Sequence, residues 1–125
     1  MTGQLEIRFQ GLGGCLIVRV AGELDAVSAP TIRDHLIGHL DLGATNLILD
    51  LSRVTIADTA GAGAVLTAGH ETKASGGVLR VAGAQHAVRR ALRALDTAGV
   101  VVLHDDVSDA LEAALEDAQA SRPTR

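Results

Sequence analysis

The spacing between strand-like segments sets strong limits on the fold of this chain. Residues 5–10 alternate apolar and polar side chains, as a half-buried strand does. Only the turn residues 11–14 separate them from a second apolar segment, residues 15–22, and so short a connection predicts an antiparallel pair. Each later strand-like segment (47–51, 78–83 and 100–103) is instead preceded by a segment of helix length.

The segments between these strands have the periodicity of amphipathic helices. Ile32, Leu36 and Leu40 recur every four residues, and Pro30 fits only the first turn of that helix. Further helices are expected from about residues 59, 85 and 108. The sequence therefore predicts a β-β-α-β-α-β-α-β-α order, an α/β fold with a mostly parallel sheet and an antiparallel edge. The length suits one domain, residues 1–118, and residues 119–125 are expected to form a flexible tail.

Composition argues against several classes of function. The net charge is −4, without a basic tract, and the chain has no Trp or Tyr to stack on bases, so we expect no nucleic-acid partner. Cys15 is the only cysteine, which excludes an internal disulfide and a cysteine-rich metal site. No apolar run is long enough to span a bilayer, and no signal segment follows Met1. A cytoplasmic protein without a membrane partner is expected.

The turn after the third strand is the most unusual local feature. Asp58 and Thr59 are followed by Ala-Gly-Ala-Gly-Ala, which opens a helix. The unpaired N–H groups and positive dipole end of a helix favour an anion there, so a phosphate on Thr59 would be tolerated. Gly61 and Gly63 remove side-chain bulk and would let another chain approach closely. The alternative is that Asp58 is merely an N-cap and the small residues pack on the sheet.

Ligand-binding motifs of other kinds are incomplete. A dinucleotide loop at Gly61 and Gly63 would need a third small residue where Leu66 stands, and no Gly-Lys-Ser/Thr ending is present. His35 and His39 are four residues apart, a spacing that suits a metal, but no third ligand completes the set. We expect two solvated helix histidines, no metal and no cofactor.

Enzyme chemistry has little support in the sequence. There is no G-x-S-x-G motif for a serine hydrolase. The acids Asp25, Asp50 and Asp58 are expected near strand ends, but no base, nucleophile or metal set accompanies them. A catalytic site is therefore not predicted.

Three stretches, VAGELDAVSAP, LILDLSRVTIAD and DTAGAGAVL, resemble the bacterial anti-sigma factor antagonists of the STAS-domain family. The order of elements agrees from about Leu5 to Ala118. The resemblance implies a partner: an anti-sigma factor that is also a serine/threonine kinase with a histidine-kinase-like ATP fold. Binding would free the sigma factor. The kinase would phosphorylate the antagonist at the start of the second helix, which ends binding, and a phosphatase would reset it.

The resemblance also implies roles for individual residues. Thr59 is the expected acceptor, because Ala60 occupies the second position, where many relatives have Ser or Thr. Asp58 should hold the turn, and Asp25 should lie across from it. Asp50 and Ser52 match strand-end positions beneath the site. The implied partner-binding residues are Glu23, Asp25, Ser28, Asp58, Thr59, Ala60, Gly61 and Gly63, with Gly22, Asp50 and Ser52 in support.

Ala60 also leaves another function open. If the kinase needs a hydroxyl at that second position, the chain would be a permanently active antagonist. It would otherwise be a STAS scaffold, or a subunit of a larger signalling or transport assembly, that is not switched by phosphate.

Overall fold

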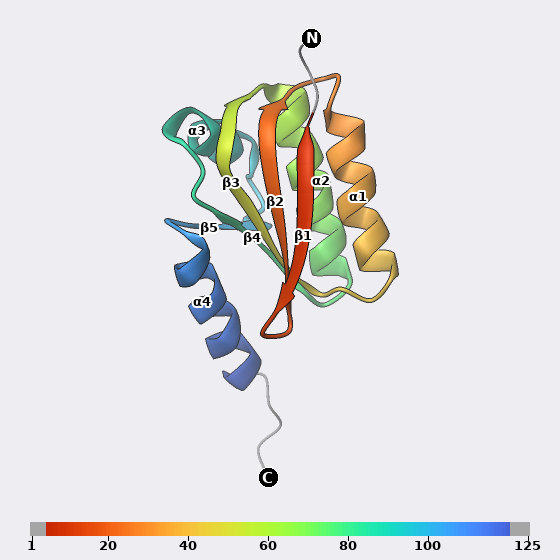
Figure 1. Ribbon diagram of the computed structural model, residues 1–125, viewed down its shortest axis with the longest axis vertical. Helices are drawn as coiled ribbons and strands as arrows, with labels where there is room; N and C mark the ends of the chain where they lie inside the picture. The colour runs from red at the N-terminus through yellow and green to blue at the C-terminus, as the bar shows by residue number, and fades with distance from the viewer. Residues whose placement is uncertain (1–4, 121–125) are drawn as a thin grey trace.

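The computed structural model describes residues 5–120, which form one five-stranded sheet and four helices (Figure 1). The strands are β1 (Glu6–Leu12), β2 (Cys15–Leu24), β3 (Asn46–Ala57), β4 (Val78–Ala82) and β5 (Val101–His104). The helices are α1 (Ala29–Asp41), α2 (Thr59–Ala74), α3 (His86–Leu95) and α4 (Val107–Ala120). This order confirms the predicted α/β fold.

The strands lie in the sheet in the same order as in the chain. β1 pairs antiparallel with β2, and β2 to β5 are parallel, which confirms the expected antiparallel edge. The turn between β1 and β2 holds only Gly13 and Gly14, whose φ values are 60° and 79°. Two consecutive left-handed residues are what a type I′ hairpin requires, so the turn is shorter than the four residues predicted.

The two faces of the sheet are covered unequally. Every crossover from β2 to β5 steps in the same direction, so right-handed connections put α1, α2 and α3 on one face. The main core lies there, between those helices and residues such as Val18, Leu49 and Val81. α4 packs on the other face against β3, β4 and β5, through a smaller cluster that includes Cys15 and Ala114. The part of that face formed by β1 and β2 is left largely open.

Two elements are longer than the sequence predicts. β3 was expected at residues 47–51 but runs to Ala57, because residues 53–57 continue to pair with β2. α4 continues to Ala120, beyond the expected domain boundary at residue 118. The remainder of the predicted tail, residues 121–125, lies outside the described residues. None of the four helices between residues 5 and 120 combines the length and apolar character needed to cross a membrane.

Candidate functional site

The carboxyl ends of β2 and β3 bring two loops together. Leu24 pairs with Ala57 in the last register position of the two strands, and the N–H of Asp58 donates to the carbonyl oxygen of Leu24 at 3.0 Å. The loop from Asp25 to Ser28 therefore begins beside the turn that carries Asp58 and Thr59. This is the arrangement expected for the ends of neighbouring parallel strands.

Asp58 holds the start of α2. It is the N-cap residue, its backbone is extended, and its carboxylate accepts a hydrogen bond from the N–H of Gly61 at 2.8 Å. Its carbonyl oxygen accepts from the N–H of Ala62. Thr59 and Ala60 follow in the first turn and are both exposed. The hydroxyl-bearing residue thus stands at the surface while the acid next to it fixes the turn.

The two glycines of this turn have different roles. Gly61 is buried, and a Cβ atom there would overlap the carbonyl oxygen of Leu24 and lie 2.8 Å from the Cβ of Leu24. Gly61 therefore lets α2 sit close to the end of β2, and it does not offer a surface to a partner as predicted. Gly63 has nothing within 4 Å of an added Cβ and is partly exposed, as that prediction requires.

The loop before α1 is held by its own side chains. The carboxylate of Asp25 accepts from the N–H groups of Val27 (3.0 Å) and Ser28 (2.9 Å). The hydroxyl of Ser28 donates to the carbonyl oxygen of Glu23 at 2.7 Å and accepts from the N–H of Asp25 at 3.1 Å. Ser28 is only 2% exposed, so it shapes the loop from inside and its side chain is not presented to a partner.

A groove of about 360 Å³ lies between the first turns of α1 and α2. Small residues dominate its lining, which consists of Ala26, Ala29, Pro30, Arg33, Ala60, Gly63, Ala64 and Thr67. Two large apolar side chains near the strand ends are exposed, Val27 at 75% and Ile56 at 54%. Such a surface suits contact with another protein better than it suits catalysis.

Sequence reasoning did not find the α1 side of this groove. Ala26 and Arg33 carry no motif, and the helix stripe predicts only which residues of α1 face the core. The pairing of α1 with α2 depends on the sheet order, so a single sequence holds no local signal for it. The sequence does not predict the exposure of Val27 either, because valine is usually buried.

Asp50 and Ser52 do not lie at a strand end beneath the turn, and this expectation was wrong. β3 continues for several residues beyond them, and they line a cavity on the α4 face of the sheet. The carboxylate of Asp50 lies 3.7 Å from the guanidinium of Arg19 and accepts from the N–H of Ser52 at 3.0 Å. Gly22, with φ 125°, sits in β2 at a register irregularity.

The two histidines of α1 lie against an aromatic ring. The ring centroids of His35 and His39 lie 5.8 Å and 4.3 Å from that of Phe9 on β1. Among residues 5–120, no group of three or more His, Cys, Asp or Glu side chains is placed to hold a metal ion.

Comparison with known proteins identifies the domain family and solved structures with a similar fold. The STAS domain model matches residues 6–110. An anti-sigma factor antagonist from Mycobacterium paratuberculosis has 23% identity and a TM-score of 0.79, over 90% of this chain and 95% of that one. The anti-sigma factor antagonist SpoIIAA in its unphosphorylated form has 21% identity and a TM-score of 0.68, over 94% and 100%. SpoIIAA from Bacillus is also known in a phosphorylated form, with 20% identity and a TM-score of 0.67, over 86% of this chain and 98% of that one.

A membrane protein contains the same fold. The murine anion transporter Slc26a9 has 20% identity and a TM-score of 0.72, over 86% of this chain but only 18% of the transporter. No curated protein matches the chain. At these identities the structural likenesses establish the fold, while the domain model covers most of the sequence. The chain therefore belongs to the STAS domain family.

Proposed function

We propose that this chain is an anti-sigma factor antagonist, a cytoplasmic binding module and not an enzyme. Its partner is an anti-sigma factor of the serine/threonine-kinase type, with a histidine-kinase-like ATP fold. Structures named as anti-sigma factor antagonists share its fold, which supports the proposal. The observation that carries it is that the exposed residue Thr59 stands directly before Ala60, which lines a groove of small residues.

The partner contacts a region that we call the switch surface, formed by Asp25, Val27, Thr59, Ala60 and Gly63. Val27 supplies an exposed apolar side chain, and Ala60 and Gly63 leave the backbone of α2 accessible. Burial of an exposed apolar side chain on binding is favourable, by about 25 cal/mol per Å² of apolar surface removed from water. Gly61 is buried and supports this surface from beneath, and Glu23 supports it through its backbone carbonyl oxygen, which accepts the hydrogen bond from the Ser28 hydroxyl.

Phosphorylation of Thr59 ends the interaction in this proposal. The phosphate adds about −1.5 to −2 charges at neutral pH, next to the Asp58 carboxylate and in the middle of the contact. A hundredfold loss of affinity needs only about 2.7 kcal/mol, which one poorly accommodated dianion supplies. A phosphatase then restores the binding form.

Intact-mass measurement with ATP and each kinase-type anti-sigma factor from the same genome tests the switch. We expect one added phosphate, and none on Thr59→Ala. Thr67→Ala is the matched control, because Thr67 is also an exposed threonine of α2 and lines the groove that Ala60 lines. A phosphate that persists in Thr59→Ala would contradict the assignment of the acceptor.

A pair of glycine variants tests the binding surface. Gly63 and Gly38 are both helical, and an added Cβ atom meets nothing within 4 Å at either. Gly63→Arg fills the groove, so we expect at least a hundredfold weaker binding to the cognate anti-sigma factor. Gly38→Arg, on the other helix and outside the groove lining, should bind normally. Equal affinities for the two variants would show that the groove is not the interface.

A second candidate function rests on Ala60, which removes one of the two hydroxyl positions of the family turn. In this case the chain is a STAS subunit that phosphate does not switch. The same experiments separate the candidates. A stable complex without phosphate transfer indicates a constitutive antagonist. Neither complex nor phosphate with any kinase-type anti-sigma factor indicates the scaffold role.

A further inference from the structure

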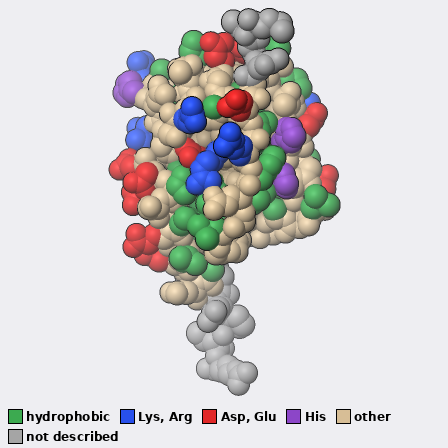
Figure 2. Space-filling view, viewed as in Figure 1, with side chains coloured by type: hydrophobic (Ala, Val, Ile, Leu, Met, Phe, Trp, Pro, Cys, Tyr) green, Lys and Arg blue, Asp and Glu red, His purple; other side chains and the backbone are tan. Residues whose placement is uncertain are grey.

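The open part of the sheet, on the face opposite α1 and α2, carries an ordered set of charged side chains. On this face Glu6, Ala21 and Arg53 lie side by side on β1, β2 and β3. The adjacent row consists of Arg8, Arg19 and Asp50 on the same three strands. Basic side chains accordingly gather near the middle of the sheet face (Figure 2).

An irregularity in the pairing of β3 with β2 places Arg53 on this face of the sheet. Arg19 pairs with Asp50, but Ala21 pairs with Arg53, so β3 has one residue more than β2 between the two positions. Ser52 and Arg53 therefore both line the cavity, although neighbouring strand residues normally point to opposite faces. Strand irregularities of this kind are frequent beside functional sites, where they redirect a side chain.

The positive charges on this face are only partly neutralised. Arg19 lies 3.7 Å from Asp50 and donates to the side chain of Gln10 at 2.6 Å. Arg8 and Arg53 have no ion pair within residues 5–120. Arg8 also lies directly opposite Arg19 in the antiparallel pair, where like charges repel. Unfavourable pairs of like charges such as this one are commonly retained at functional sites.

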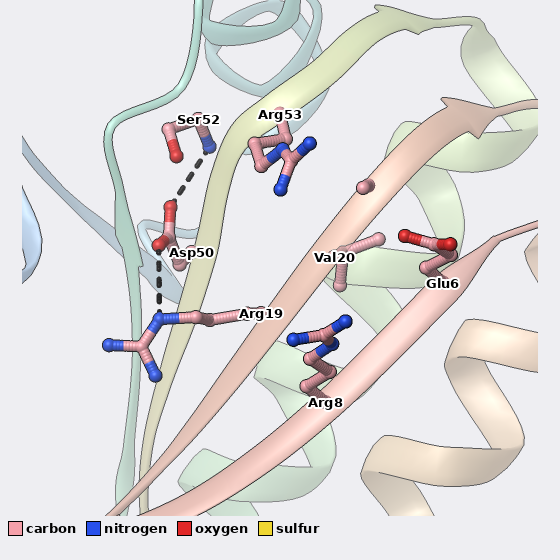
Figure 3. Close-up of a pocket in the computed structure, with 8 residues that line it drawn as sticks. Glu6, Arg8, Arg19, Val20, Asp50, Ser52 and Arg53 are labelled. Carbon is pink, nitrogen blue, oxygen red and sulfur yellow. Dashed lines mark hydrogen bonds and ion pairs between the residues drawn. The ribbon is translucent and has the colours of Figure 1, made fainter.

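The small side chain of Ala21 leaves a cavity between the arginines. Its volume is about 100 Å³, and its lining includes Glu6, Arg8, Arg19, Ser52 and Arg53 (Figure 3). Pockets for drug-sized molecules measure roughly 300–1,000 Å³, so this one suits a single small group. Guanidinium groups present paired N–H donors that match the oxygens of phosphate.

We propose that this cavity binds one phosphate group, held between the guanidiniums of Arg8 and Arg53, with Arg19 and the Ser52 hydroxyl completing the site. Glu6 lies at the cavity wall, where its carboxylate accepts a hydrogen bond from the P–OH group of a singly protonated phosphate. Sulfate has the same shape but no proton near neutral pH, so Glu6 makes the site select phosphate. This site is independent of the switch surface, which lies on the other side of the sheet.

NMR titration of the isotope-labelled full chain with inorganic phosphate, at constant ionic strength and pH 7, tests this proposal. We expect saturable shifts at Ala21 and at the arginine side chains of the cavity, with a dissociation constant on the order of 1 mM. Arg8→Gln and Arg53→Gln should each weaken binding at least tenfold. Arg90→Gln is the control, because Arg90 is exposed on α3 and also has no ion pair within residues 5–120.

Titrations with two other ligands identify the source of the phosphate group and the role of Glu6. Tighter binding of glycerol 3-phosphate than of inorganic phosphate assigns the site to a phosphate monoester, and the reverse order assigns it to the free ion. Sulfate should bind at least tenfold more weakly, and Glu6→Gln should abolish that difference. Shifts that never saturate, or that persist unchanged in the Arg8→Gln/Arg53→Gln double variant, overturn the proposal. Equal binding of sulfate and phosphate to the unmodified chain removes Glu6 from the site.

Discussion

Gly61 and Gly63 are two residues apart in α2, but a Cβ atom added at each would meet different surroundings. Gly61 is in contact with Leu24, whereas Gly63 faces open space. In helices, glycine costs about 0.5–1 kcal/mol relative to alanine. The open position should therefore gain stability from alanine, and the packed position should lose it.

The first prediction concerns these two positions. Gly61→Ala should lower the free energy of unfolding by about 1–3 kcal/mol, because α2 must move away from the end of β2. Gly63→Ala should raise it by up to about 1 kcal/mol. Urea denaturation of both variants measures the two changes. A Gly61→Ala protein as stable as the unmodified chain would mean that the contact with Leu24 relaxes without cost.

The second prediction concerns Arg8, which stands opposite Arg19 across the β1–β2 pair. In phosphate-free buffer, Arg8→Gln should raise the free energy of unfolding by about 0.2–1 kcal/mol, since it removes a like-charge pair. Added phosphate should stabilise the unmodified chain more than the variant, because the stabilisation by a ligand falls as its affinity falls. Thermal denaturation with and without phosphate decides this, and a destabilised variant in both buffers would contradict it.

At the scale of elements, local chemistry in the sequence was enough to predict the capped turn at Asp58. An acid followed by small residues predicted that Asp58 caps α2, and the structure has that cap. The end of β3 was missed for the opposite reason. Ser52, Arg53 and Thr55 look like loop residues, and they are in a strand only because β2 extends beside them. The prediction for Asp50 was therefore wrong too, because the pairing of β3 with the distant segment β2 determines where the strand ends.

α4 is attached to the sheet by few apolar side chains and by one buried charge. Arg80 of β4 is 5% exposed, forms an ion pair with Asp117 of α4, and lies 3.0 Å from Nε2 of His104. Burial, and then the positive charge of Arg80, lower the pKa of His104 below 6.5, although nearby carboxylates oppose this. The neutral imidazole is the form that accepts a hydrogen bond from Arg80.

The third prediction is a pH effect at this contact. Because the pKa of His104 is lower in the folded chain, the unfolded chain binds the proton more readily. Stability from the neutral imidazole is fully present above pH 6.5 and is lost as the pH falls below that value. The free energy of unfolding should therefore fall more between pH 7.5 and 5.5 in the unmodified chain than in His104→Gln. Identical pH profiles would exclude a contribution from His104.

At the scale of the whole molecule, the sheet separates two surfaces. The loop before α1 and the first turn of α2 carry the switch surface at the end of one side, and α4 shares the other side with the arginine-lined cavity. This division follows from the strand order, since three crossovers in one direction put three helices on one face. The last helix alone cannot cover the remaining face.

The fourth prediction uses Cys15 to report detachment of α4. The thiol is buried against Ala110 and Ala114, and burial raises its pKa. It should react with a thiol reagent only after α4 opens. Asp117→Ala leaves Arg80 without its carboxylate, so we expect labelling at least tenfold faster.

Glu116→Ala is the matched control for this experiment. Glu116 precedes Asp117 on α4 and forms no ion pair within residues 5–120. Its replacement should leave the labelling rate close to that of the unmodified chain. Equal acceleration by both variants would attribute the effect to the net charge of the helix.

The contact of Gly61 with Leu24 also has a kinetic consequence. Because α2 is packed against the end of β2, the proposed partner would meet a turn that is already formed. Encounter with a preformed surface proceeds at rates near 10⁵–10⁷ M⁻¹s⁻¹, and changes in one interface alter mainly the dissociation rate. Modification of Thr59 would then shorten the residence time of the complex, while free protein and partner would continue to meet as often as before.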